Sequence, residues 1–359
     1  MGGKQGIAGT QRRQFGTLPD GEAVEAIRLS NASGLSATIL TYGASLQALL
    51  VPDREGRFAD VVLGHASLQP YLAQPQYFGA TVGRVANRIA RGRFRLDGAD
   101  YQVPVNDGAN ALHGGARGFD KANWRVSAIG ESPASVTLIH VSPDGDQGFP
   151  GRLTATARYS LTDDNALHID YAAETDRPTI VNLSNHAYWN LGGEGAGTAM
   201  DHRLQILAGH FLPTDTGAIP TGELRPVAGT VFDFRAPAVI GSRVRDARDD
   251  QIAIGRGYDH NWVLAAGAGE LRPVARLEDP RSGRVMEMLS DQPGLQFYSG
   301  NFLDGTSVGK AGRLYRMGDA VALEPQAFPD TPNRPGFGSV RLEPGGVYRN
   351  LIVLRFSTL

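Results

Sequence analysis

Residues 153–161, LTATARYSL, and residues 167–171, LHIDY, decide the fold class of this chain. In the first stretch apolar side chains occupy every second position, and threonine, arginine and serine fill the positions between them. The second stretch repeats the pattern with Leu167, Ile169 and Tyr171. Successive side chains of a β-strand point to opposite faces, so a period of two places one face of each strand in a core. Both stretches are therefore predicted to be half-buried strands.

Alternation and turn residues extend this prediction along the chain. Residues 348–356 again place apolar side chains on one parity, and Asp97-Gly98 is a strong hairpin signal between two short runs. The 46 glycines and 21 prolines imply many turns, and the best helical candidate, residues 67–73, is short. We expect an all-β protein, a large antiparallel assembly of stacked sheets with few short helices. This pattern does not choose between a sandwich, a jelly roll and a propeller.

The chain shows no division into several domains. Residues 192–197 are rich in glycine but too short for a flexible linker, so we expect a loop tip there. A large all-β domain can reach this length, and residues 15–359 are expected to form one domain. Residues 1–14 are expected to be a flexible tail, and they contain no apolar stretch of a signal peptide. No run approaches the roughly 20 apolar residues of a membrane span, so no membrane partner is expected.

Composition excludes several classes of function. The formal net charge of −2 and the lack of a long basic run argue against a nucleic-acid partner. The chain has no cysteine, which excludes disulfides, thiolate nucleophiles and cysteine-ligated metals. None of the eight histidines has the close spacing of a metal site, and neither a serine nucleophile elbow nor a phosphate-binding loop is present.

Two polar clusters in the first third of the chain are candidates for ligand binding. Residues 83–89, GRVANRI, combine two arginines with an asparagine, and such donors suit vicinal hydroxyls. Surface charge beside a strand explains this cluster equally well. Residues 110–115, NALHGG, place a histidine before two glycines, where the backbone can bend towards a ligand. An ordinary turn with an incidental histidine is the alternative.

Two more clusters follow in the second half of the chain. Residues 182–190, NLSNHAYWN, contain His186, which can titrate near neutrality, and two aromatic side chains that could pack on a sugar ring. A polar strand end with core aromatics is the alternative. Residues 322–330, ALEPQAFPD, place Glu324 in an apolar run, where a carboxylate is costly unless it is functional or at an edge. Residues 258–262, YDHNW, and residues 292–298, QPGLQFY, join these clusters.

In this order, the clusters resemble the aldose 1-epimerase (galactose mutarotase) family, from about Thr41 to Phe356. Each motif is modestly specific, and the ordered set is highly specific. The resemblance implies a β-supersandwich with an open cleft, no cofactor, no metal and a free monosaccharide such as glucose or galactose as substrate. It implies a monomer or homodimer; a cytoplasmic location is expected, or a periplasmic one if a signal peptide was removed. Trp189 stands where the family often has phenylalanine.

The family's functional residues carry over onto matching positions of this chain. Glu324 corresponds to the general base, His186 to the general acid, and His113 to a residue that supports the transition state. The implied sugar contacts are Asn87, Arg88, Tyr188, Asp259 and Gln296. Residues 192–200 are expected to help select the preferred sugar.

The proposed chemistry needs particular ionisation states. Glu324 must be charged, which is its default near neutrality, and His186 must be protonated. We expect Asp259 or Glu324 to raise the pKa of His186. Three alternatives remain open: a sugar-binding protein without catalysis, an epimerase of a sugar phosphate bound by Arg84, Arg88 and Arg91, and a glycosidase that pairs Asp259 with Glu324.

Overall fold

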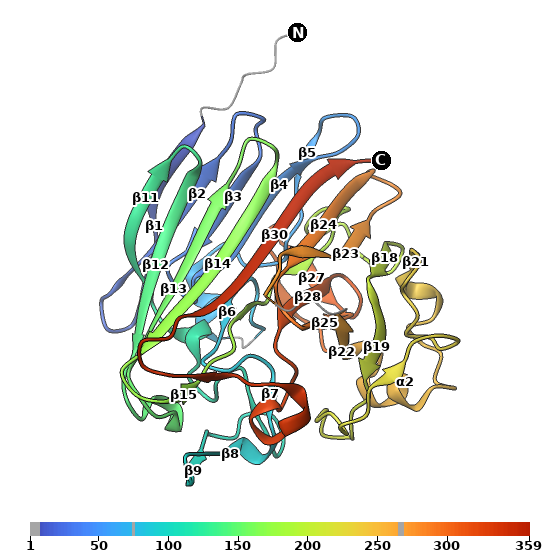
Figure 1. Ribbon diagram of the computed structural model, residues 1–359. Coiled ribbons are helices and arrows are strands. Elements are labelled where there is room, and N and C mark those ends of the chain that lie inside the picture. The colour runs from blue at the N-terminus through green and yellow to red at the C-terminus, as the bar shows by residue number, and fades with distance from the viewer. Residues whose placement is uncertain (1–7, 74–75, 265–268) are drawn as a thin grey trace.

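The centre of the molecule is a nine-stranded antiparallel sheet, seen in a computed structural model that describes residues 8–73, 76–264 and 269–359 (Figure 1). Its strands lie in the order β11-β12-β13-β14-β30-β24-β23-β18-β21. Their bounds are Arg125–Glu131, Ala134–Ser142, Leu153–Leu161, Ala166–Thr175, Tyr348–Thr358, Arg284–Ser290, Arg272–Glu278, Arg203–Ile206 and Ala238–Val239.

The two alternating stretches at residues 153–161 and 167–171 lie in β13 and β14, which pair as neighbours within this sheet. Leu161 lies opposite Leu167, and Tyr159 lies opposite Ile169. The apolar parity of β13 is buried, while Arg158 of the other parity is exposed. C-terminal strand β30 joins the other edge of β14, so segments far apart in sequence lie side by side here.

Two smaller antiparallel sheets complete the layers. A five-stranded meander contains β1 (Gly9–Thr17), β2 (Ala23–Ser30), β3 (Ser36–Leu40), β4 (Ser45–Pro52) and β5 (Phe58–Asp60). A six-stranded sheet has the order β17-β28-β25-β22-β19-β20, with bounds Tyr188–Trp189, Val321–Gln326, Gly294–Tyr298, Asp259–Leu264, Ala208–Leu212 and Arg225–Pro226.

One hydrophobic cluster joins all three sheets. It contains Leu49 of the meander, Leu354 of the nine-stranded sheet and Phe297 of the six-stranded sheet, each almost fully buried. Burial of this apolar area is the main term that stabilises the layers. The prediction of a large antiparallel β-supersandwich is confirmed, and every pairing between named strands in the described residues is antiparallel.

Short ribbons and helices fill the edges of the layers. The paired ribbons are β6 (Thr81–Val82) with β16 (Ser184–Asn185), β7 (Arg88–Ile89) with β10 (Ala111–Leu112), β8 (Arg93–Leu96) with β9 (Ala99–Gln102), β15 (Thr179–Ile180) with β29 (Arg341–Leu342), and β26 (Asp304–Val308) with β27 (Leu314–Arg316). The helices are α1 (Leu68–Ala73) and α2 (Asp250–Gly255), with 3-10 turns at Ala90–Gly92, Phe119–Lys121, Asp146–Gly148, Ile240–Ser242, Thr331–Asn333 and Pro335–Phe337.

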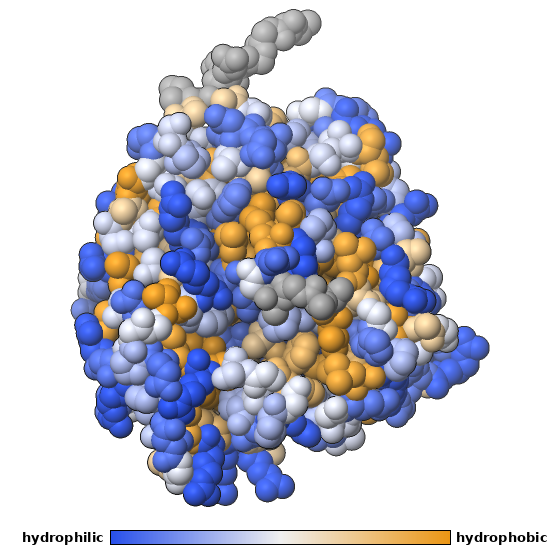
Figure 2. All heavy atoms as spheres, in the orientation of Figure 1, coloured by the Kyte–Doolittle hydropathy of each residue, from blue (hydrophilic) through white to orange (hydrophobic). Residues whose placement is uncertain are grey.

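Local predictions can be compared with these bounds. The Asp97-Gly98 turn joins β8 to β9, residues 67–73 contain α1, and residues 192–197 form turns between β17 and β18, as expected. The expected tail of residues 1–14 is wrong for residues 9–14, which pair with β2 in strand β1; residues 1–7 lie outside the described part. No helix in the described ranges is long and apolar enough to span a bilayer. In Figure 2, hydrophilic residues dominate the outline of one face, and apolar patches gather near its centre.

Candidate active site

All eight residues predicted for the site line one cavity of about 280 Å³. The cavity lies where strands β22, β25 and β28 meet the loops that follow β6, β10 and β16. Its full lining is Gln76, Tyr77, Asn87, Arg88, Asp107, Leu112, His113, His186, Tyr188, Asp259, Gln296, Tyr298, Phe302 and Glu324. The volume is at the small end of ligand pockets and suits a single sugar ring.

Strand register explains why residues distant in sequence converge here. In the six-stranded sheet Gln296 of β25 lies directly opposite Glu324 of β28, so their side chains share one face. Asp259 begins the next strand, β22, and Gln296 Nε2 donates a hydrogen bond to Asp259 Oδ1 at 2.8 Å. The sheet therefore presents an acidic and amide surface as the floor of the cavity.

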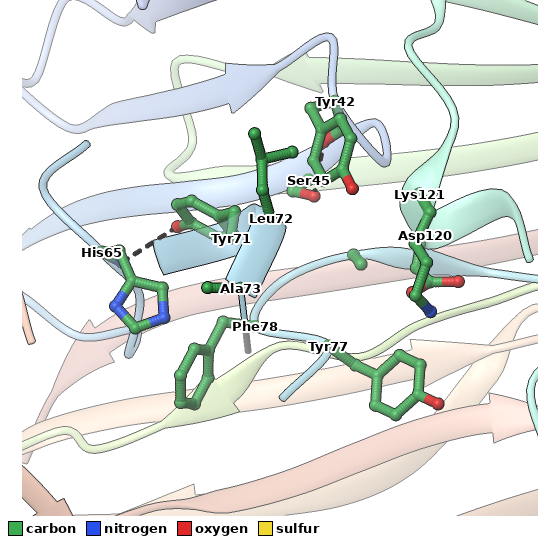
Figure 3. Close-up of a pocket in the computed structure, with 11 residues that line it drawn as sticks. Tyr42, Ser45, His65, Tyr71, Leu72, Ala73, Tyr77, Phe78, Asp120 and Lys121 are labelled. Atoms are coloured by element: carbon green, nitrogen blue, oxygen red, sulfur yellow. Dashed lines mark hydrogen bonds and ion pairs between the residues drawn. The ribbon is translucent and has the colours of Figure 1, made fainter. Parts of the chain in front are cut away.

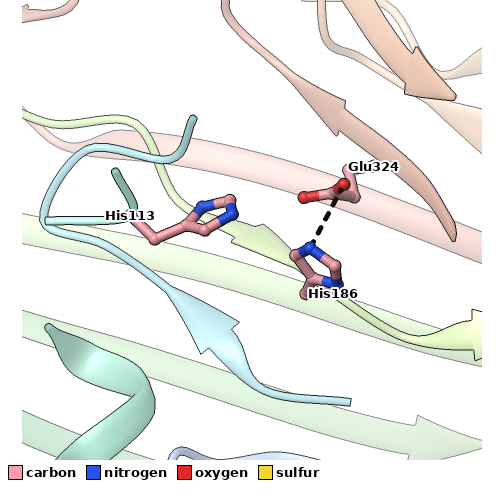
Figure 4. A group of neighbouring side chains, drawn as sticks. All are labelled: His113, His186 and Glu324. Carbon is pink, nitrogen blue, oxygen red and sulfur yellow. Dashed lines mark ion pairs between the residues drawn. The ribbon is translucent and has the colours of Figure 1, made fainter. Parts of the chain in front are cut away.

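His186 faces Glu324 from the segment between β16 and β17. Its Nε2 lies 3.7 Å from Glu324 Oε1, and both side chains are buried (Figure 4). Backbone bonds hold the segment in place: His186 N–H donates to the Ala80 carbonyl at 2.8 Å, and Gly79 N–H donates to the His186 carbonyl at 3.0 Å. These contacts fix the Cα position of the histidine relative to the floor.

His113 and Asn87 hold each other in left-handed backbone conformations, with φ of 51° and 62°. The Asn87 N–H donates to His113 Nδ1 at 3.1 Å, and the His113 N–H donates to the Asn87 carbonyl at 3.0 Å. Such conformations cost of order 1–3 kcal/mol each and persist where the surroundings enforce them. Because Nδ1 of neutral His113 accepts a hydrogen bond, its Nε2 carries the hydrogen.

This tautomer bears on metal binding. One ligand atom from each of His113, His186 and Glu324 can lie within 4.8 Å of the others, a spacing that could hold an ion. A metal needs a free lone pair on each imidazole. The Asn87 amide occupies the lone pair on Nδ1 of His113, and Nε2 is protonated, so the residues present a hydrogen-bond donor instead of a third ligand.

Arg88 is clamped between two carboxylates. Its Nε donates to Asp107 Oδ2 at 2.7 Å, and its Nη1 lies 3.9 Å from Asp259 Oδ2. Burial opposes the charge of Arg88, but Asp259 and Asp107 outweigh it and raise the pKa of the guanidinium. Sequence reasoning missed Asp107, because an aspartate before glycine is ordinary turn chemistry. It also missed Tyr77, whose single aromatic ring gave no signal.

Burial sets ionisation states that differ from the predicted ones. It lowers the pKa of His186 to about 4, whereas we expected a carboxylate to raise it. It also raises the pKa of Glu324 well above its ordinary value, with Asp259 adding to the effect and Arg88 opposing it. Burial of His186 therefore outweighs the carboxylate effect that we expected. Burial thus favours the neutral form of each group, which for the pair His186–Glu324 is the state with one proton, on Glu324.

Several neighbours in sequence lie away from the cavity. Arg84 is buried and donates to the carbonyls of Pro150 and Gly151, so it is a structural residue instead of a sugar or phosphate contact. Trp189 is buried in the core and packs near Phe356. Among the described residues of the cavity wall, Arg88 is the only lysine or arginine, and residues 192–200 contribute nothing to it.

The described fold and cavity define a class: a large antiparallel β-sandwich that carries a buried acid–base pair and donors for a small polyhydroxyl ligand. The family described as aldose 1-epimerase matches residues 25–355, and the chain belongs to this family.

Named relatives are similar to this chain over nearly its full length. The galactose mutarotase of Rattus norvegicus is 43% identical over 347 residues, covering 96% of this chain and 98% of that protein. The aldose 1-epimerase of Escherichia coli (strain K12) is 40% identical over 340 residues, covering 94% and 96%. The crystal structure of an aldose epimerase homologue from C. elegans has a TM-score of 0.86 at 34% identity and covers 93% of this chain and 99% of that one.

Proposed function

We propose that this chain interconverts the α and β anomers of free aldohexoses such as glucose and galactose. The observation that carries the proposal is the buried pair of His186 and Glu324, 3.7 Å apart, in a cavity for one sugar ring. The relatives named galactose mutarotase and aldose 1-epimerase support the same reaction.

Two proton transfers open the ring. The Glu324 carboxylate takes the proton of the C1 hydroxyl, while the His186 imidazolium gives its proton to the ring oxygen O5. The C1–O5 bond breaks, and O1 becomes the oxygen of an aldehyde. Rotation about C1–C2 presents the other carbonyl face, and closure returns both protons to their origins. One positioned acid and one positioned base each supply about 10²–10⁴-fold, without a cofactor.

Burial of the pair favours these transfers. Ring opening starts from the ion-pair form, Glu324 carboxylate and His186 imidazolium, and leaves the pair neutral; both forms hold one proton, and burial favours the neutral one. The same burial that raises the pKa of Glu324 and lowers that of His186 makes the carboxylate a stronger base and the imidazolium a stronger acid. Once the ion-pair form is present, burial therefore favours both proton transfers of ring opening.

The remaining wall residues bind and orient the sugar. Arg88, held by Asp107, offers a fixed fork of donors, and Asp259 with Gln296 offers acceptors and a donor for hydroxyl groups. Asn87 and Tyr188 complete the sugar contacts on the wall. Neutral His113 gives its Nε2–H to the charge that develops on the reacting oxygens.

The alternatives have less support from these contacts. A phosphate substrate needs a free cation, but Arg88 is already paired with two carboxylates. For a glycosidase, Asp259 would have to act as the second carboxylate, and it is engaged by Arg88 and Gln296. A sugar-binding protein has no use for a buried acid–base pair.

Polarimetry on freshly dissolved sugars tests the proposal. We expect the chain to accelerate the mutarotation of α-D-glucose and α-D-galactose far beyond the rate in buffer, with α-D-xylose and α-L-arabinose completing the panel. Sugar binding is measured on the same preparation by calorimetry. Binding of both hexoses without acceleration of mutarotation would identify a sugar-binding protein and overturn the proposal.

A further inference from the structure

His186 lacks the hydrogen bond that usually fixes an active-site imidazole. Its Nδ1 is buried and has no hydrogen-bond partner among the described residues. Apart from the contact of its Nε2 with Glu324, the histidine side chain is therefore oriented by packing. Two tyrosine rings pack against it: Tyr77 stacks at a centroid distance of 5.6 Å and an angle of 29°, and Tyr188 lies tilted at 5.0 Å and 31°.

Tyr77 separates the site from a second cavity of about 260 Å³. Tyr77 lines the second cavity (Figure 3) and also lines the site cavity. On the site side, the ring also meets His113 edge to face at 4.7 Å. On the other side Lys121 Nζ lies 5.3 Å from the ring centroid, and the same ammonium pairs with Asp120 at 2.7 Å. The ring thus has defined contacts in both directions.

The backbone holds Tyr77 in place against a conformational cost. Its φ of 57° is left-handed, which is uncommon for a bulky residue. Ala80 N–H donates to the Tyr77 carbonyl at 3.0 Å, and residues 79 and 80 are bonded to the backbone of His186. A Cβ on Gly79 would lie 2.0 Å from the Leu46 carbonyl oxygen, so the turn after Tyr77 admits only glycine. The segment that carries the ring is therefore tied to the segment that carries the acid.

We propose that Tyr77 is a positioning residue for the acid: its ring holds the imidazole of His186 towards Glu324 and keeps water of the neighbouring cavity from His186 Nδ1. This inference rests on the proposed function. The aromatic face performs this role and the hydroxyl does not, because the contacts with His186 and His113 are ring contacts.

The test compares Tyr77→Phe, which keeps the ring, with Tyr77→Leu, which removes it. We expect Tyr77→Phe to retain kcat within about twofold. Tyr77→Leu should lower kcat by about tenfold or more, with KM within about threefold, because misplacement of a catalytic group by about 1 Å can cost ~10² in rate. Tyr77→Met, which fills similar space without a ring, is measured as a second ring-less variant. If only one of Tyr77→Leu and Tyr77→Met folds, its kcat tests the inference. Tyr101→Leu is the matched control, since Tyr101 packs on Phe94 away from the site.

A pH profile of kcat/KM separates positioning from a general structural effect. The titratable and charged groups around His186 are Glu324, His113, Tyr188 and Tyr77, with Lys121 beyond the Tyr77 ring. In Tyr77→Leu, water reaches the imidazole and the pKa of His186 rises. The fall of kcat/KM on the acid side of the profile should therefore occur at higher pH than in the wild type, whereas Tyr77→Phe should keep the wild-type profile. A ring-less variant with wild-type kcat and an unmoved profile would overturn the inference. An inactive wild type would instead overturn the proposed function.

Discussion

At the scale of single residues, burial is the property that governs the site. It pushes the pKa values of His186 and Glu324 in opposite directions, so each group is held in the form that it takes after proton transfer. Asn87 fixes the tautomer of His113 through a backbone amide. The site therefore contains one fixed hydrogen-bond donor, Nε2–H of His113, and one proton that His186 and Glu324 exchange.

The shared proton predicts a broad plateau in the pH dependence of kcat/KM. Activity should fall as the pH drops towards about 4, where His186 and Glu324 are both protonated, and again as the pH rises through the raised pKa of Glu324, where the pair loses its proton. Stopped-flow polarimetry between pH 3.5 and 10 measures the profile. A steep loss of activity centred on the ordinary histidine pKa of about 6.5 would contradict this ionisation scheme.

The family resemblance pointed to eight residues that the structure brings to one cavity, but it did not predict their ionisation states. Glu324 stands out because a carboxylate interrupts an apolar run, and His186 because it lies in a cluster of polar residues. Their pKa shifts depend on depth of burial, which no local pattern encodes. Asp107 and Tyr77 were missed because each looks ordinary in its own segment, and their roles come from contacts with Arg88 and His186.

At the scale of elements, long strands were predictable and two-residue ribbons were not. Strands β13 and β14 carry a clear alternation, and the Asp97-Gly98 turn defines the β8–β9 hairpin. Ribbons such as β7–β10 are too short for a period, and their pairing is non-local. Yet these ribbons place Arg88 next to Leu112 and thereby bring His113 into the site.

Arg84 links the end of β12, the loop before β13 and the start of β15. Its guanidinium donates to Ser142 Oγ at 2.5 Å, to the Pro150 carbonyl at 2.9 Å and to Thr179 Oγ1 at 3.3 Å. We predict that Arg84→Met lowers the free energy of unfolding by about 3 kcal/mol or more, since each buried polar group left unpaired costs about 1–3 kcal/mol. The KM of the folded fraction should not change, because Arg84 lies outside the cavity.

Urea unfolding and sugar kinetics together check the role of Arg84. Arg158→Met is the matched control, since Arg158 is exposed on β13, and such a change stays within about 0.5 kcal/mol. An Arg84→Met protein of wild-type stability with a raised KM would show that this arginine binds substrate.

At the scale of the whole molecule, one large sheet backs two smaller ones. The hydrophobic cluster that joins them leaves the floor strands β22, β25 and β28 rigid, while loops from distant parts of the chain supply the acid and the donor. Preorganisation of this kind lets a site hold catalytic groups without a cofactor.

We predict that mutarotation needs no divalent metal. Extensive dialysis against EDTA should leave the rate of mutarotation unchanged, and micromolar Zn²⁺ should not inhibit it, because protonated Nε2 of His113 is not a ligand. Polarimetry before and after dialysis measures this. Loss of activity on dialysis that returned with one metal would contradict the prediction.

The most direct test of the acid–base pair is the rate of mutarotation of α-D-galactose by Glu324→Gln and His186→Asn at saturating sugar. Glu324→Gln keeps the size of the side chain, and His186→Asn keeps a hydrogen-bonding amide. Glu174→Gln, on the exposed surface of β14, is the matched control. We predict that each site variant loses at least about a hundredfold in kcat, that each remains folded, and that the control retains the wild-type rate. Retention of more than about a tenth of the activity by a folded variant would remove that residue from the mechanism.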